Sequence, residues 1–169
     1  VVRADNRAYG TKSCQYIGQH VQAGKVVQIM GDLASVNGRD RAEAFRTCMK
    51  DFPNLKVLEI PAGWKSDAAA AALDSLLSAN PDVKGIYMHA GGVYLAPTLQ
   101  TLRRKGLLFP AGDAKHIVVV SNDGIAQEYD AIRKGEIDAT ISQPADLYAK
   151  YGLYYIKATL AGQTFKVGP

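Results

Sequence analysis

The sequence predicts an α/β fold, with a doubly wound parallel sheet and helices on both faces. Short apolar runs of strand length alternate along the chain with segments whose apolar residues recur at helical spacing. One run, Ile117–Val120, is apolar at every position, which is typical of a parallel strand covered by helices on both sides. Regular alternation of strand and helix favours one parallel sheet with right-handed crossovers.

The first helix and strand have clear signals. Asp5 and Asn6 are N-cap candidates, and Ala23-Gly24 closes the helix before the strand Lys25–Met30. The same signals predict a helix from about Arg39, a strand Leu55–Ile60 ended by Pro61, and a helix capped by Ser66 or Asp67. A strand Val83–Met88 and a helix to about Lys105 follow. The chain then continues with the strand Ile117–Val120 and a turn at Ser121–Gly124, a helix with Ile125, Tyr129 and Ile132, and a strand Ile137–Ile141.

The last predicted helix differs from the others. Past Gln143-Pro144 it carries a wide apolar stripe, and Gly162 ends it. The stripe consists of Leu147, Tyr148, Tyr151, Tyr154, Tyr155 and Ala158. A helix so apolar on one face needs a partner surface, either the preceding sheet or a domain that this chain does not contain.

Composition and charge limit the classes of function that the sequence predicts. The 169 residues, 47% hydrophobic and 21% charged, suffice for one domain with a sizeable core. The net charge of +4 is mild and its one basic cluster, Arg103–Lys105, is interpreted as a solvated helix end, so no nucleic-acid partner is expected. No apolar run approaches the roughly 20 residues of a membrane span. The start at Val1 lacks an initiator Met and reads as if entered in mid-strand, which predicts either a mature product or, as we favour, an excised fragment.

No cofactor, metal or enzymatic motif is evident. The three histidines are scattered without metal-ligand spacing. The glycines of Gly31–Gly38 do not have the compact spacing of a dinucleotide-binding loop. There is neither a phosphate-cradling loop nor a nucleophile elbow with a Ser/His/Asp set. We therefore expect no cofactor, no metal and no enzyme; an α/β enzyme using Asp123 is the least favoured alternative.

Two cysteines allow at most one internal disulfide. Cys14 and Cys48 both lie on apolar stripes of predicted helices that flank the same first strand. A bridge would need Cα atoms within about 7 Å, which is feasible if the two helices share a face of the sheet. Two buried thiols remain the alternative, and we favour the disulfide.

Polar residues follow the ends of successive predicted strands. They are Asp32, Arg39, Arg41, Trp64, His89, Asp123 and Gln143. In open α/β sheets, ligands bind just beyond the carboxyl ends of the strands. Arg supplies a fork of donors, Asp accepts from hydroxyls, and an aromatic face covers the C–H surface of a sugar. The set therefore predicts a site for a polyhydroxyl ligand, centred on Asp123.

Each candidate also has an alternative interpretation. Asp123 is suited to an Asx turn or a helix cap before Ile125. Arg41 is suited to a surface ion pair, Trp64 to packing on the core, and His89 to hydrogen bonds with the loop backbone. Gln143 is suited to ending a strand before Pro144.

The chain resembles the C-terminal half of periplasmic sugar-binding proteins of the ribose-binding type, which share their fold with lactose-repressor-like regulators. Segments in the family's order and spacing carry the resemblance over nearly the whole chain. They are Ala4-Asp5-Asn6, Gly38-Arg39-Asp40-Arg41-Ala42-Glu43-Ala44-Phe45, Asn80-Pro81-Asp82-Val83-Lys84-Gly85-Ile86, Ser121-Asn122-Asp123-Gly124, and Gly135-Glu136-Ile137-Asp138-Ala139-Thr140-Ile141-Ser142-Gln143.

The resemblance implies roles for four side chains. Arg41 would bind ring or hydroxyl oxygens, Trp64 would stack on the sugar, and Asp123 and Gln143 would bond hydroxyls near the hinge. One departure concerns the loop after Met88, where ribose binders carry Asn-Asp and this chain has Ala90-Gly91. The resemblance then implies a missing hydroxyl contact, with His89 or a bulkier ligand group in the space.

The resemblance also implies an organisation and a cellular role. Residues 1–143 would form the C-terminal lobe, and residues 144–169 would form a crossover helix and segment belonging to an absent N-terminal lobe. The whole protein would be the sugar- or polyol-binding component of a bacterial ABC importer, periplasmic, closing on its ligand without chemistry and docking on a membrane permease. The alternative is the effector-binding core of a lactose-repressor-like transcription regulator.

Overall fold

A computed structural model describes residues 2–166 and divides the chain into two units. The larger unit is Asn6–Ser142, and the smaller one takes in Val1–Asp5 and Gln143–Pro169. The boundaries fall at the N-cap predicted for the first helix and just after the last predicted strand. Each unit is described in turn.

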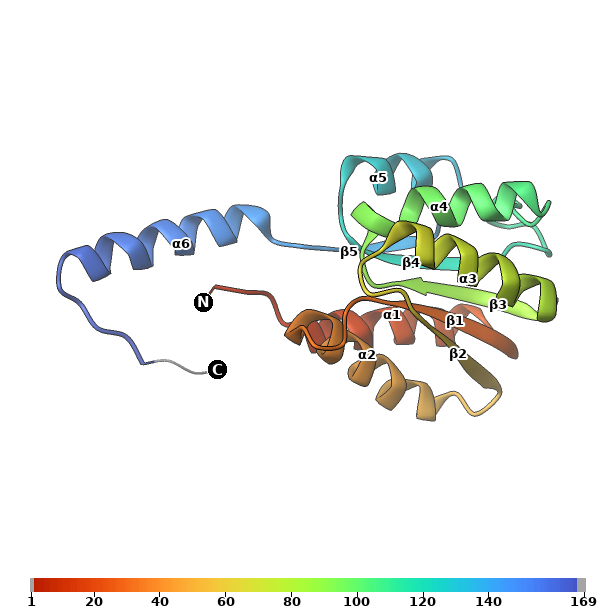
Figure 1. The fold of residues 1–169 in the computed structure, drawn as a ribbon, viewed down its shortest axis with the longest axis horizontal. Helices are drawn as coiled ribbons and strands as arrows, with labels where there is room; N and C mark the ends of the chain where they lie inside the picture. The colour runs from red at the N-terminus through yellow and green to blue at the C-terminus, as the bar shows by residue number, and fades with distance from the viewer. Residues whose placement is uncertain (1, 167–169) are drawn as a thin grey trace. The chain divides into compact units, whose positions relative to one another are not determined.

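The larger unit is a five-stranded parallel sheet with helices on both faces, as predicted (Figure 1). The strand order is β2-β1-β3-β4-β5, and every neighbouring pair is parallel. The elements are α1 (Asn6–His20), β1 (Gly24–Met30), α2 (Val36–Cys48), a short 3-10 turn η1 (Met49–Asp51), β2 (Leu55–Pro61), α3 (Ser66–Ala79), β3 (Val83–Met88), α4 (Gly91–Arg104), β4 (Val118–Asp123), α5 (Ala126–Arg133) and β5 (Ala139–Ser142).

Two apolar cores lie on opposite faces of the sheet, because successive side chains of a strand point to opposite sides. Val27 and Ile29 of β1 pack with Leu73 of α3 and Leu99 of α4 in one core. Val26 of β1, Tyr87 of β3 and Val120 of β4 pack with Ile17 of α1 and Phe45 of α2 in the other. Helices α1 and α2 therefore cover one face, and α3 and α4 cover the other (Figure 1).

Three predicted boundaries were wrong. Helix α2 begins at Val36 and not at Arg39, because the side-chain oxygen of Ser35 accepts from Gly38 N and caps it. Strand β4 continues through Ser121–Asp123, which were predicted as a turn, because these residues pair with β5. Strand β5 begins at Ala139, two residues later than predicted.

The predicted disulfide is confirmed between Cys14 of α1 and Cys48 of α2. The two Cα atoms are 6.1 Å apart, within the range that a bridge can span. Both side chains belong to the core beneath α1 and α2, so the two helices do share a face of the sheet. The bridge fixes α1 and α2 to each other.

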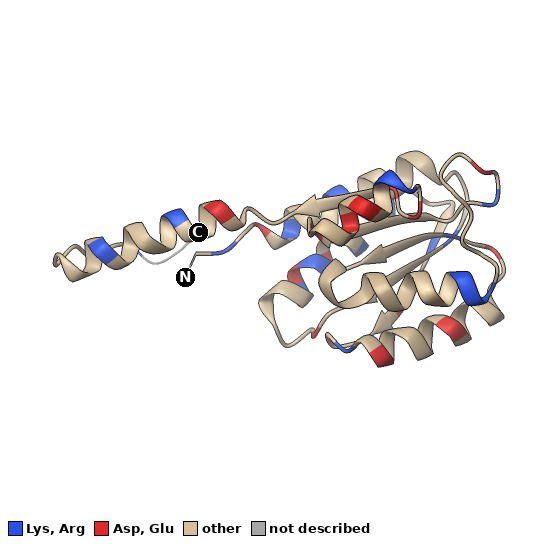
Figure 2. Ribbon diagram, turned by 90° about the horizontal axis from the view of Figure 1, so that it is seen from above, with Lys and Arg blue, Asp and Glu red and all other residues tan. Residues whose placement is uncertain are grey.

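The smaller unit contains helix α6 (Ala145–Leu160). At 100° per residue, Leu147, Tyr151 and Tyr154 lie on one face and Leu153, Ile156 and Leu160 on the opposite face. All six side chains are exposed, Leu160 by 84%. Within the unit, the rings of Tyr154 and Tyr155 pack against Phe165. Asp146, Lys150 and Lys157 supply the charges of α6, whereas α3 carries only acidic residues and α4 only basic ones (Figure 2).

Candidate functional site

The carboxyl ends of β1, β3 and β4 bring most of the predicted residues to one edge of the larger unit. After β1 the chain crosses to β2 on one side, and after β2 it returns to β3 on the other. Such a reversal of strand order is where open α/β sheets bind ligands. Arg41 lies near the start of α2, Trp64 and His89 follow β2 and β3, and Asp123 is the last residue of β4.

Arg41 lies in the second turn of α2 and is only 2% exposed. Its Nε donates to Asn6 Oδ1 over 2.9 Å, and its Nη1 donates to the carbonyl oxygen of His89. The guanidinium carbon lies 4.9 Å from the centre of the Tyr9 ring, in cation–π contact. These contacts hold Arg41 in one orientation, so the surface ion pair of the alternative interpretation is not its environment.

His89 is completely buried at the end of β3. Gly31 N donates to its Nδ1 over 3.2 Å, and burial, with the charges of Arg41 and Arg46, lowers the pKa of His89 to about 3. The ring is therefore neutral with its proton on Nε2, which lies 2.9 Å from the side-chain amide of Gln28. Because two donors cannot bond, the Gln28 amide is assigned with its oxygen toward the ring. This is the backbone-bonded histidine of the alternative interpretation, and its ring presents no surface to a ligand.

Trp64 follows β2 in a backbone conformation with φ of 62°. Its N–H donates to Tyr94 Oη over 2.9 Å, and its ring stacks on the Tyr94 ring at 6.4 Å between centroids. A Cβ on Gly31 would come within 2.0 Å of the Trp64 ring, so the indole lies directly over the end of β1. The ring is half-buried against the core and keeps an exposed part.

Asp123 ends β4 with φ of 126°, a conformation that L residues rarely adopt. Its Oδ2 accepts from Gly92 N, in the first turn of α4, over 3.1 Å. The positive end of the α4 dipole favours a negative charge there. Asp123 thus contacts the start of α4, the helix that precedes β4, and the N-cap of α5 is Ile125.

The other predicted residues have different environments. Asp32 is exposed, and its Oδ1 accepts from Ala34 N in a two-residue turn. Arg39 is exposed and lies 3.8 Å from the carboxylate of Asp40. Gln143 belongs to the smaller unit, where Tyr148 Oη donates to its Oε1 over 3.0 Å. The geometry of the larger unit therefore brings together Arg41, Trp64 and Asp123, with His89 beneath them.

Sequence reasoning missed three buried polar residues that support this edge. Asn6 was predicted only as a helix cap, yet its side chain bonds both Arg41 and Asn37. Asn122 was predicted in a turn, yet its Nδ2 donates to Tyr87 Oη over 2.8 Å inside the sheet. The third, Glu128, is fully buried beneath the turn after β4. Its place after Ile125, at the spacing of a capping box, was the available signal.

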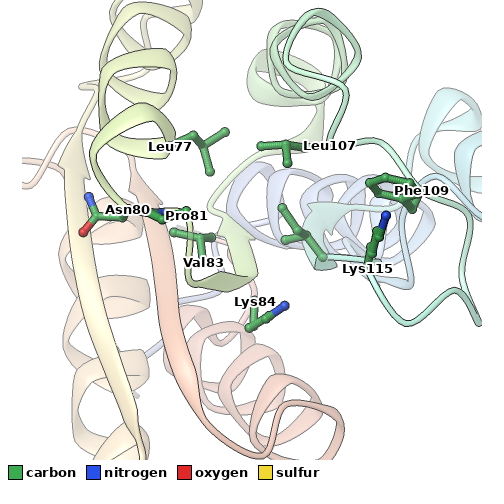
Figure 3. A pocket seen from close by; sticks show the side chains of 9 residues that line it. Leu77, Asn80, Pro81, Val83, Lys84, Leu107, Phe109 and Lys115 are labelled. Carbon is green, nitrogen blue, oxygen red and sulfur yellow. The ribbon is translucent and has the colours of Figure 1, made fainter.

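One cavity lies elsewhere, at the opposite edge of the sheet. It has a volume of about 180 Å³ and lies between the start of β3 and the loop before β4 (Figure 3). Leu77, Val83, Leu107 and Ile117 form apolar walls, and Lys115 lies over the Phe109 ring. Among residues 2–166, no cluster of His, Cys, Asp or Glu could hold a metal ion. No helix in that range is long and apolar enough to cross a membrane.

The side chains gathered at this edge can form a binding surface. It offers an oriented guanidinium, a carboxylate and an aromatic face, which together suit hydroxyl groups and the C–H surface of a sugar ring. His89, the one buried histidine at this edge, is bonded on both ring nitrogens to Gly31 and Gln28 and not to a nucleophile.

Comparisons with known proteins bear on this arrangement. The profile of a family described as periplasmic binding protein domain matches residues 1–164. The D-apiose import binding protein of Paraburkholderia graminis is 30% identical over 129 residues, which cover 76% of this chain and 39% of that protein. The D-allose-binding periplasmic protein of Escherichia coli is 29% identical over 152 residues, covering 88% of this chain and 47% of that protein.

A solved structure shows the same fold. An ABC transporter periplasmic solute binding protein from Actinobacillus succinogenes, with bound D-allose, superposes with a TM-score of 0.86 at 19% identity. The match covers 98% of this chain and 57% of that one. The chain thus spans about half the length, or less, of the curated relatives described above.

Proposed function

The chain belongs to the family of periplasmic binding protein domains, and from that premise we propose that it forms one wall of a hinged cleft that binds a sugar or polyol and releases it unchanged. The observation that carries the proposal is the orientation of Arg41 and Asp123 by bonds within the larger unit. Groups fixed before the ligand arrives lose less conformational entropy on binding.

Each side chain has a proposed role. Arg41 donates to ring or hydroxyl oxygens, Asp123 accepts from hydroxyls, and the exposed part of Trp64 covers the apolar side of the sugar. Gln143, in the smaller unit, supplies a further polar contact near the hinge. Asp32 and His89 are left out of the ligand set, because Asp32 is bound in its own turn and both ring nitrogens of His89 are bonded to Gly31 and Gln28.

The proposed lobe organisation is close to the division into units, which assigns residues 1–5 and Gln143 to the smaller unit. Residues 1–143 form the C-terminal lobe, and residues 144–169 belong to an N-terminal lobe supplied by the rest of the protein. Support comes from α6, whose two opposite apolar faces leave leucine, isoleucine and tyrosine side chains exposed. A sheet of the second lobe would cover at least one of these faces.

The proposed setting is the bacterial periplasm, with the closed protein docking on the permease of an ABC importer. One relative described above is named as an import binding protein, and the other is named as a periplasmic binding protein. The Cys14–Cys48 disulfide supports an oxidising compartment and argues against a cytosolic transcription regulator, where thiols stay reduced.

Calorimetry on the intact protein tests the proposal with D-ribose, D-allose, D-apiose and xylitol as probes. At least one probe should bind, and Asp123→Ala should weaken that binding by roughly 10- to 100-fold, because ligand hydroxyls lose a charged acceptor. Asp130→Ala is the matched control, since Asp130 is an exposed aspartate on α5 paired with Arg133. Equal affinity of the Asp123→Ala variant and the control would exclude Asp123 from the site.

A further inference from the structure

Glu128 is a fully buried carboxylate that the proposed ligand contacts do not use. It lies in the first turn of α5, beneath the turn that joins β4 to that helix. Burial raises the pKa of Glu128 and the nearby charge of Asp123 adds to the rise, although hydrogen bonds from Ser121, Ile125 N and Thr140 oppose it. A carboxylate kept in such a place is tolerated only where several donors satisfy it.

Those donors lead directly to the residues that follow Asp123. Ile125 N donates to Glu128 Oε2 over 2.9 Å, and Thr140 Oγ1 donates to Glu128 Oε1 over 2.9 Å. The same Thr140 hydroxyl accepts from Gly124 N over 3.2 Å. Glu128 therefore holds Ile125 directly and Gly124 through Thr140 of β5.

The turn so held has an unfavourable backbone. Asp123 has φ of 126° and Gly124 has φ of 73°. A non-glycine residue in this region persists only where the surrounding structure determines it. The Glu128 and Thr140 bonds provide that constraint at the two residues after Asp123.

Glu128 also occupies the space at the start of α4. A Cβ on Gly91 would lie 2.1 Å from Glu128 Oε1, so only glycine leaves room for the carboxylate. The next residue, Gly92, donates its N–H to Asp123 Oδ2. The Glu128 side chain from α5 thus fills the space beside Gly91. Glu128 therefore lies between the start of α4, which bonds Asp123, and the turn that follows Asp123.

We propose that Glu128 is a positioning residue, which holds the β4–α5 turn against β5 and α4 so that the Asp123 carboxylate is oriented toward a hydroxyl of the ligand. This inference rests on the proposed role of Asp123. Glu128 itself does not touch the ligand. Its acceptor oxygens are needed, so protonation of Glu128 removes an acceptor and loosens the turn.

The binding test compares Glu128→Gln with Asp130→Asn, which makes the same change at an exposed position of the same helix. With the probe sugar that the unaltered protein binds best, Glu128→Gln should weaken affinity about tenfold, because one carboxylate oxygen becomes a donor facing a donor. The affinity of the unaltered protein for this sugar should also fall as the pH is lowered, because protonation of Glu128 removes an acceptor. The Glu128→Gln variant lacks this carboxylate, so its affinity should depend less on pH. A variant that matches Asp130→Asn in affinity and pH profile overturns the proposal.

A second pair of variants keeps the test decisive if Glu128→Gln folds poorly. Thr140→Val removes the bridging hydroxyl with little change of shape, whereas Thr140→Ser keeps it. Thr140→Val should weaken sugar binding and Thr140→Ser should retain it. Equal affinity of the two contradicts the bridge through Thr140.

A ligand-free measurement separates this proposal from the proposed function. In ¹H–¹⁵N spectra of the intact protein, Glu128→Gln should shift the amide signals of Gly92, Gly124 and Ile125, and Asp130→Asn should leave them in place. If no probe binds, or Asp123→Ala is without effect, the proposed function fails while these signals still decide the role of Glu128. Unshifted signals overturn the positioning role.

Discussion

The disulfide between α1 and α2 should supply a measurable part of the stability. Its removal, by reduction or by the double substitution Cys14→Ala and Cys48→Ala, releases a loop closed over a sequence separation of 34 residues. In the chain-entropy description, a loop of that length stabilises the folded state by about 4 kcal/mol at 25 °C. Both side chains are buried among Ile17 and Phe45, so the alanine variant also loses some packing.

Urea unfolding of the intact protein, followed by Trp64 fluorescence with and without dithiothreitol, measures this contribution. With a urea dependence of about 2 kcal/mol per molar, the midpoint should fall by about 2 M on reduction. Sugar affinity in the absence of urea should stay nearly unchanged, because the bonds of Arg41 to Asn6 and His89 do not involve the cysteines. An unchanged midpoint, in protein whose thiols become titratable on reduction, would refute the entropic argument.

Three further predictions follow from single contacts. Sugar binding should shift the Trp64 emission or protect it from iodide, since its ring is half-exposed at the site edge; an unresponsive Trp64 would leave it with a packing role only. Gly31→Ala should weaken sugar binding and displace the Trp64 ring, because the new Cβ would lie 2.0 Å from it, whereas Gly152→Ala, where a Cβ meets nothing, is the matched control; equal affinity and emission would contradict the contact. The ring of His116 lies between two acceptors, Asp138 Oδ2 and the Phe109 carbonyl, and the Asp138 bond above all raises the pKa of His116. Its stabilisation is therefore complete below the usual value of 6.5 and lost as pH rises through the raised pKa. The unfolding free energy of the unaltered protein should exceed that of His116→Asn most at about pH 5 and least at about pH 8; a constant difference would contradict a charged His116.

The fold could be predicted because each element has its own local signal. Short apolar runs of strand length and period-3.6 apolar patterns identified all five strands and six helices. The boundaries were harder where tertiary contacts decide them. Ser121–Asp123 favour turns in isolation, but the Asn122 side chain finds Tyr87 Oη and the His89 carbonyl inside the sheet, so β4 continues.

The site was predictable at the strand ends but not beneath them. Arg41 and Asp123 were predicted from their positions after β1 and β4, and the structure places both at the same edge. The burial of Glu128 depends on Gly91, which lies 37 positions earlier, and that pairing exists only once α4 and α5 are packed. His89 was predicted at the strand end, but whether its ring faced outward depended on Gly31 and Gln28 of another strand.

Helix α1 joins the two places at which the chain passes between the units. Asn6, the first residue of the larger unit, is bonded to Arg41 and Asn37, while Tyr9 Oη donates to the carbonyl oxygen of Ser142, the last residue of that unit, over 3.4 Å. Both connecting segments are thereby attached to one rigid helical turn, on which the Arg41 guanidinium also rests. In the proposed cleft, a rotation of the second lobe would act on segments that adjoin this turn of α1, and the same turn contacts Arg41 through both Asn6 and Tyr9.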